Sequence, residues 1–104
     1  MGTNQTPGSD TLCEAIRRRT LVEFHYHGLH RVVEPYCYGI STRGAELLRA
    51  VQIRGSSSSG GFGFGKLWLV EDMVDLRMTD EPFEPDDPNY NPNDSGMKRV
   101  LCRI

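Results

Sequence analysis

Hydrophobic and polar residues alternate along the middle of the chain with the period of two that is typical of half-buried β-strands. In residues 21–27, valine, phenylalanine and tyrosine fall on one face of an extended segment, and a glutamate and two histidines fall on the other. Gly28 interrupts this pattern. Residues 30–40, HRVVEPYCYGI, then predict a returning strand, in which Pro35 needs an edge or a bulge because it cannot donate a hydrogen bond.

The alternation continues after a turn predicted at residues 41–44, STRG. Residues 45–54, AELLRAVQIR, predict a third strand. A Ser/Gly-rich connection follows, and we expect it to be flexible. A fourth strand begins at Lys66, a tight break falls near Glu71 and Asp72, and a fifth strand runs through Met78.

One short helix precedes the strands. Thr11 and Glu14 have the spacing of a capping box, and apolar residues follow at helical intervals until Arg19 or Thr20. Residues 1–10 are polar and contain glycine and proline, so we expect a disordered N-terminus. Five short strands after one helix predict a mostly β fold, a small and strongly bent barrel, over residues 11–79.

The C-terminal part of the chain, residues 80–104, differs in composition. It is acidic and rich in proline and asparagine, and it ends in the strand-like KRVLCRI. Proline forbids a regular helix there, while Phe83 and Tyr90 are costly to leave in water. We therefore expect this extension to pack on the barrel. There it covers a basic surface, or it adds an edge strand to its own barrel or to that of a second copy.

Size and composition set further limits. A chain of 104 residues with 38% apolar residues supports one compact domain. No apolar run is long enough for a membrane span and the first residues lack a signal-peptide pattern, so we expect a cytoplasmic protein without membrane contact. Cys13, Cys37 and Cys102 lack metal-site or disulfide-framework spacing, which favours reduced thiols.

Charge is unevenly distributed along the chain. The formal net charge is −2, with 9 Lys/Arg and 8 Asp/Glu in residues 1–79 and no Lys/Arg but 6 Asp/Glu in residues 80–94. Binders of duplex DNA usually show a basic excess, so this balance argues against that class. Gly61-Phe62-Gly63-Phe64 matches part of an RNA-recognition signature, but no second helix fits between residues 20 and 80, which favours a loop.

Several ordered motifs resemble the WYL domain, a ligand-sensing module of bacterial transcriptional regulators and phage-defence proteins. The resemblance covers residues 12–83. The matching positions are Ala15-Ile16, Phe24-x-Tyr26-x-Gly28, Arg31-x-Val33-Glu34-Pro35-Tyr36 and Trp68-x-Val70-x-x-Met73. The resemblance implies an SH3/Sm-like barrel that binds a nucleotide or single-stranded nucleic acid and acts through a partner protein, without the winged helix that such regulators carry for DNA binding.

A site of that kind needs cations for phosphate and rings for stacking. The candidate ligand-binding residues are Arg31, Tyr36, Arg43, Arg49 and Lys66. Arg49 shares strand parity with apolar residues, so it either lines a cleft or forms a buried pair, with Glu34 or Glu46 as the expected partners.

The chain also departs from the family pattern. Glu46-Leu47-Leu48 replaces Trp-Tyr-Leu, and Glu71-Asp72-Met73 replaces Asp-Arg-Ile. These losses favour a second hypothesis, a non-enzymatic interaction or assembly module, for example a homodimer, that has lost its ligand.

Catalytic and metal chemistry find less support. His25 and His27 share a strand face and His30 follows, but the resemblance places them on a polar outer surface, and no Asp or Cys partner lies at tight spacing. Cys37 is the one cysteine expected to be exposed. No nucleophile elbow or phosphate-binding loop occurs. We therefore expect no enzyme, no metal and no cofactor.

Overall fold

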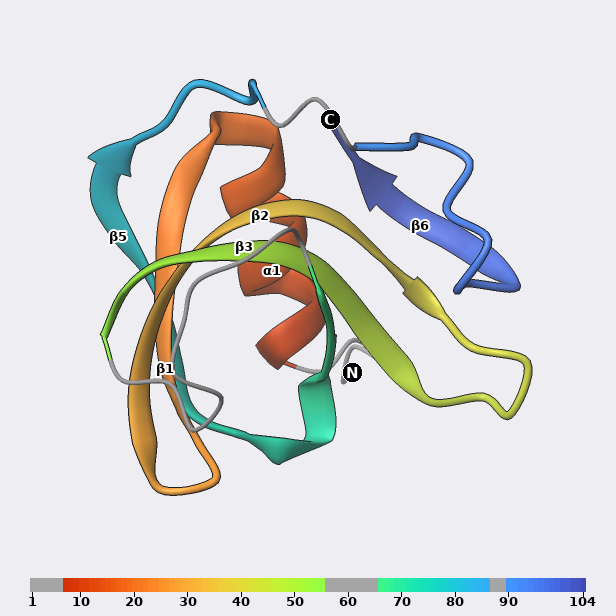
Figure 1. Ribbon diagram of the computed structural model, residues 1–104, viewed down its shortest axis with the longest axis horizontal. Helices are drawn as coiled ribbons and strands as arrows, with labels where there is room; N and C mark the ends of the chain where they lie inside the picture. The colour runs from red at the N-terminus through yellow and green to blue at the C-terminus, as the bar shows by residue number, and fades with distance from the viewer. Residues whose placement is uncertain (1–6, 56–65, 87–89) are drawn as a thin grey trace, which may run out of the picture.

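A computed structural model describes residues 7–55, 66–86 and 90–104, and it shows one α-helix and an antiparallel sheet of six strands (Figure 1). The elements in chain order are α1 (Pro7–Arg18), β1 (Thr20–Tyr26), β2 (Leu29–Ile40), β3 (Glu46–Gly55), β4 (Lys66–Leu69), the single 3₁₀ turn η1 (Val70–Asp72), β5 (Met73–Pro82) and β6 (Arg99–Arg103). The mostly β fold and its one helix are confirmed. The Gly-Phe-Gly-Phe motif lies outside the described residues.

The helix begins earlier than predicted. It starts at Pro7, so the expectation of disorder up to residue 10 is wrong for its last four positions, and Thr11 lies inside the helix. Proline suits a first helical turn because its missing N–H has no partner there in any case. Leu12, Ala15 and Ile16 are buried, and α1 packs against β1, β2, β5 and β6.

The described strands form an open path in the order β4-β3-β2-β1-β5, with β6 paired to β2. β1 and β2 form a tight hairpin through His27 and Gly28, which both have positive φ values, 52° and 81°. No pairing joins β4 to β5 within these strands, so closure into a barrel stays a prediction. β5 continues to Pro82, past the boundary expected at residue 79.

β2 is the longest strand of the sheet, and it changes partners along one edge. β3 pairs with it from Arg31 to Ile40, while β1 and then β6 take the other edge. Pro35 stands at a register shift, as its missing donor requires. Gly39 permits the close approach of β6, because a Cβ there would lie 2.2 Å from the carbonyl oxygen of Arg99.

Alternation divides the apolar side chains between two clusters. The larger cluster lies between α1 and the sheet and includes Phe24, Leu48 and Trp68. The smaller one lies on the opposite parity of β3, with Leu47 and Met97, and Phe83 and Tyr90 pack against it. Side chains on both faces of β3 therefore reach buried clusters, one shared with residues of α1 and the other with Phe83, Tyr90 and Met97.

A disulfide between Cys13 and Cys102 joins α1 to β6. The prediction that all three thiols are reduced is wrong, because the fold brings together two cysteines that are 89 positions apart in the sequence. Cys37 stays free and is buried. Within the described ranges, no helix has the length and apolar character needed to cross a membrane.

Candidate functional site

Two of the predicted cations, Arg31 and Lys66, converge on the indole of Trp68. The guanidinium carbon of Arg31 lies 5.5 Å from the centroid of the Trp68 ring and 5.7 Å from that of Tyr26. The Nζ of Lys66 lies 5.0 Å from the Trp68 centroid. The two rings meet edge to face at 4.9 Å. We call these four residues, together with Gln52, the Trp68 cluster.

Strand pairing assembles this cluster. Lys66 and Trp68 are two positions apart on β4 and therefore share one face of the sheet. In the neighbouring strand β3, Ala50 pairs with Lys66, and its carbonyl accepts a hydrogen bond from Trp68 Nε1 at 3.2 Å. Gln52 follows Ala50 on the same face of β3 and reaches β2, where Arg31 lies.

Arg31 is a buried cation, with 3% of its surface exposed. Its Nη1 donates to Gln52 Oε1 at 3.3 Å, and its Nη2 donates to the carbonyl oxygen of Tyr26 at 3.2 Å. Its Nε has no hydrogen-bond partner in the described part of the chain, and no carboxylate there forms an ion pair with it.

A buried guanidinium without a counter-ion is unusual, because desolvation of the charge is not compensated by an opposite charge. The faces of Tyr26 and Trp68 compensate in part through cation–π attraction. With Lys66 beside the same indole, the cluster holds two positive charges, and the described residues bring no carboxylate to either. An oxyanion would complete both the charge balance and the hydrogen bonding of Arg31.

Arg49, the third predicted cation, takes part in an ion pair on the other face of β3. Its Nε and Nη2 donate to the two carboxylate oxygens of Asp94 at 2.7 and 2.9 Å. Asp94 also accepts a hydrogen bond from the backbone N–H of Gly96. These hydrogen bonds lower the pKa of Asp94 and raise the pKa of Arg49. Of the two alternatives for Arg49, the structure shows an ion pair, and it is formed with Asp94, a carboxylate that the sequence had not suggested.

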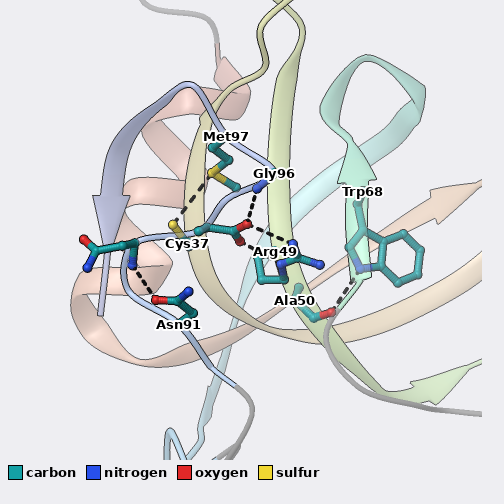
Figure 2. A network of polar contacts seen from close by, with 9 residues as sticks. Cys37, Arg49, Ala50, Trp68, Asn91, Gly96 and Met97 are labelled. Atoms are coloured by element: carbon teal, nitrogen blue, oxygen red, sulfur yellow. Dashed lines mark hydrogen bonds and ion pairs between the residues drawn. The ribbon is translucent and has the colours of Figure 1, made fainter.

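Figure 2 shows how the segment before β6 reaches this pair. Gly96 and Met97 lie beside Arg49 and Cys37, and the Cys37 thiol is 3.7 Å from the sulfur of Met97. A Cβ on Gly96 would come within 3.3 Å of Arg49 Nη2. The Arg49 guanidinium is thus packed against the chain's own backbone as well as paired with its own carboxylate.

Tyr36 and Arg43 lie apart from the Trp68 cluster. The Tyr36 ring is 1% exposed and contacts Phe83 and Tyr90, at centroid distances of 5.6 and 5.1 Å. Arg43 is exposed in the turn between β2 and β3, where its backbone N–H donates to the Ser41 hydroxyl. The structure thus brings together two of the five predicted site residues, and it places the other three elsewhere.

Two of the histidines lie beside carboxylates, and the free thiol is buried. His27 lies 3.2 Å from Asp72, and His30 lies 3.7 Å from Glu23. Among the residues with described positions, no three His, Cys, Asp or Glu side chains are grouped to hold a metal. Cys37, expected to be exposed, is fully buried, and burial raises its thiol pKa to about 11, which disfavours the reactive thiolate form.

Sequence reasoning missed Tyr26, Gln52 and Trp68 as members of a site. Gln52 offered the clearest signal, because a polar amide follows Leu48 and Ala50 on the buried parity of a strand. A buried amide needs partners, and here Arg31 supplies one. Asp94 offered no comparable signal, since its contact with Arg49 depends on how residues 90–97 fold back onto the sheet.

Comparison of the chain with protein-family models, with curated proteins and with solved structures gives no match.

Proposed function

We propose that this chain is a WYL-like ligand-sensing regulatory domain on an SH3/Sm-like barrel, and that it binds a nucleotide or single-stranded nucleic acid and acts through a partner protein. The observation that supports this most is the buried Arg31, whose Nε has no hydrogen-bond partner among the residues that the structure describes. A buried cation without a counter-ion lowers the stability of the folded protein, and an anionic ligand that pairs with the cation restores it. The proposed barrel would be completed by β4 and β5 closing on each other.

Within such a ligand, the phosphate is the part that the Trp68 cluster recognises. The indole is 2% exposed and is in contact with Phe24, Tyr26 and the two cations, so a base would have to displace these neighbours to stack on it. A phosphate oxygen needs only the donors of Arg31 and Lys66. We therefore expect inorganic phosphate or pyrophosphate to bind weakly, and nucleotides to bind through the same groups.

The emission of Trp68 tests this proposal, because it is the one tryptophan of the chain. The titrants are inorganic phosphate, pyrophosphate, ATP and an oligodeoxythymidylate of about eight nucleotides, within the site size of single-strand binding domains. We expect a saturable change in emission that weakens steeply with added salt. Arg31→Gln should weaken binding by about 1–3 kcal/mol, the range for charge-assisted hydrogen bonds.

Two further variants keep the test decisive. Lys66→Gln changes a partly exposed cation beside the same indole, so it reports on the site even if Arg31→Gln folds poorly. Arg18→Gln removes an exposed cation on α1 and serves as the control. The proposal is wrong if no titrant binds at low salt, or if Arg18→Gln has the same effect as the two cluster variants.

The second candidate is an interaction or assembly module that has lost its ligand. It is favoured by β5, which pairs with β1 on one edge and carries Val74 with 57% of its surface exposed. The other edge of β5 has no partner strand in the described part of the chain, and such an edge with an exposed apolar residue invites pairing with a second chain. A dimer or larger ring in light scattering that binds no titrant would favour this candidate over ligand sensing.

A cytoplasmic location belongs to the proposal, and the disulfide gives it a direct test. Thiol pairs in the cytosol are mostly kept reduced, whereas oxidising compartments preserve them as disulfides. Trapping thiols by alkylation in intact cells would measure the state of Cys13 and Cys102. A fully oxidised pair in every cell sample would contradict a cytoplasmic location.

A further inference from the structure

A groove of about 940 Å³ runs between β5 and β6 on the outer side of α1. Figure 1 shows these two strands on opposite sides of the helix. Cys13, Glu14 and Arg17 of α1 line the groove, together with the middle of β5 and the end of β6. It does not include any member of the Trp68 cluster.

The groove combines an apolar lining with the disulfide. Leu76 and Met78 line it from β5, and Leu101 lines it from β6 with 43% of its surface exposed. The bond from Cys13 to Cys102 fixes β6 against the helix at this place. Apolar side chains that gather along one groove, unlike single exposed ones, are a feature of interaction sites.

One wall of the groove is an unpaired strand edge. β1 and β6 lie one after the other along the same edge of β2, and the far side of β1 is taken by β5, whereas β6 has no further partner among the described strands. A register shift between Tyr38 and Gly39 leaves Leu101 as the extra residue of β6, and such bulges re-aim a side chain. The free edge offers backbone donors and acceptors to an extended chain.

The outward row of β6 carries positive charge on both sides of Leu101. Arg99 and Arg103 are exposed at alternate positions of the strand, and Arg103 also lines the groove. Its Nη1 donates to the carbonyl oxygen of Pro92, and no carboxylate among the described residues forms an ion pair with it or with Arg99. Side chains placed opposite this row would be favoured in the order acid, apolar, acid.

From these observations we propose that the groove binds an extended acidic peptide of a partner protein, which adds as a strand to the free edge of β6. Its outward side chains alternate between carboxylates at the arginines and an apolar residue at Leu101. Its inward side chains lie on the apolar lining beside the disulfide. This site is independent of the ligand at the Trp68 cluster, and it gives the partner protein of a regulatory domain a place to bind.

A second copy of this chain fits the same edge poorly. Antiparallel pairing of two β6 strands centred on Leu101 would place Arg99 opposite Arg103 of the other copy, and like charges directly opposite each other repel. Nucleic acid also fits less well than a peptide. The lining holds three arginines and two acids, which is far from the basic excess that phosphate backbones require.

Fluorescence anisotropy on the oxidised full chain tests the proposal with a labelled glutamate–valine peptide of about eight residues, the length of an ordinary strand. Its outward row runs glutamate, valine, glutamate, and its inward row is valine. A lysine–valine peptide of the same length tests charge. A third peptide, with proline at two valine positions, cannot make the full set of backbone hydrogen bonds. We expect both control peptides to bind at least about tenfold more weakly.

Variants of the protein test whether the peptide binds at β6. Arg99→Glu should weaken binding of the glutamate–valine peptide by about tenfold, whereas Arg43→Glu, with the same change of charge in the β2–β3 turn that does not line the groove, should not. Bound peptide should also slow hydrogen exchange of the β6 amides. A thermal melt checks that Arg99→Glu is folded, and Leu101→Asp is a second variant with the same expected loss.

Several results would overturn the proposal. One is equal affinity for the proline-containing peptide, which would exclude strand addition. Another is an oligodeoxythymidylate that competes for the site and binds more tightly, and a third is protection of the β6 amides by dimerisation without peptide. Phosphate binding followed by Trp68 emission is measured on the same Arg99→Glu protein, so failure of the peptide site and failure of the ligand site are distinguished.

Discussion

The guanidinium of Arg49 in β3 binds both carboxylate oxygens of Asp94, which lies 45 positions later in the chain. The Asp94 side chain is 4% exposed, while that of Arg49 is 29% exposed. The acid is therefore the buried partner and depends on the arginine for its charge compensation. This pair fixes the segment before β6 onto the sheet.

Arg49→Ala should lower the free energy of unfolding by about 2–3 kcal/mol, because it leaves a buried carboxylate without its cation. Urea denaturation measures this change, with Arg43→Ala as the exposed control. Asp94→Ala and the double variant complete a cycle, and we expect the double variant to be more stable than the sum of the single effects implies. Full additivity would show that the two side chains do not interact.

The same pair predicts that the stability of the protein depends on pH in the acidic range. The pKa of Asp94 is lowered in the folded state by its hydrogen bonds with Arg49, so the unfolded chain takes up the proton first. The pair's contribution to the free energy of unfolding is present above the ordinary aspartate pKa near 3.8, and it is lost as the pH falls through the lowered pKa of folded Asp94. Denaturation from neutral to acidic pH should show this loss. A slope that persists unchanged in Asp94→Asn would assign it to other carboxylates.

Arg31 should behave differently from Arg49 when it is replaced. Arg31→Met removes a buried cation that has no carboxylate partner among the described residues, so lost cation–π and hydrogen-bond contacts are offset by relief of desolvation. We expect the free energy of unfolding to stay within about 1 kcal/mol of the original. Chemical denaturation measures it. A loss of about 3 kcal/mol or more, the range for breaking a buried network, would make Arg31 a structural residue instead.

Gly39 should tolerate no side chain. A Cβ at this position would lie 2.2 Å from the Arg99 carbonyl oxygen and 2.7 Å from the sulfur of Met97, so β6 has to move away. We expect Gly39→Ala to lower the free energy of unfolding by about 1–3 kcal/mol, as overpacking does. Hydrogen exchange should also show faster opening of β6. Thr42→Ala, in an exposed turn, is the comparison, and equal protection of β6 in both variants would contradict this packing.

The disulfide predicts a defined count of reactive thiols. Of the 3 cysteines, 1 is free, and it is buried with its thiol pKa raised to about 11. Alkylation followed by mass spectrometry should label no thiol rapidly in the folded protein, one after denaturation, and three after denaturation with reduction. Loss of the bond through Cys13→Ala should cost about 2–4 kcal/mol of stability. Three labelled thiols without a reducing agent would show that the bond does not form.

The sequence by itself determined the strands of the middle of the chain and the buried face of β1. Alternation at Val22, Phe24 and Tyr26 reflects local geometry, because successive side chains of a strand must point to opposite faces. The turns at Gly28 and Gly44 follow from positive φ values that glycine adopts without strain. The helix was also predictable, but its first turn was not, because the polar residues before Thr11 resemble a disordered end.

Tertiary structure decided which of the polar residues meet. Arg31 and Lys66 share the Trp68 ring only because β3 lies between β2 and β4 and brings both side chains to one face. No local pattern in the sequence indicates this contact, because the period of a strand shows which face a side chain occupies but not which residue it meets. The sequence therefore proposed five candidate residues with equal weight, and the packing separated them.

The longest contacts were the least visible in the sequence. Cys13 meets Cys102, and Arg49 meets Asp94, because β6 pairs with the second half of β2 and brings the end of the chain back over its beginning. That pairing depends on Gly39 being small, because the backbone of β6 passes close to it. That β6 is a strand could be predicted from its own residues. Which strand it pairs with depends on the space that distant residues leave open.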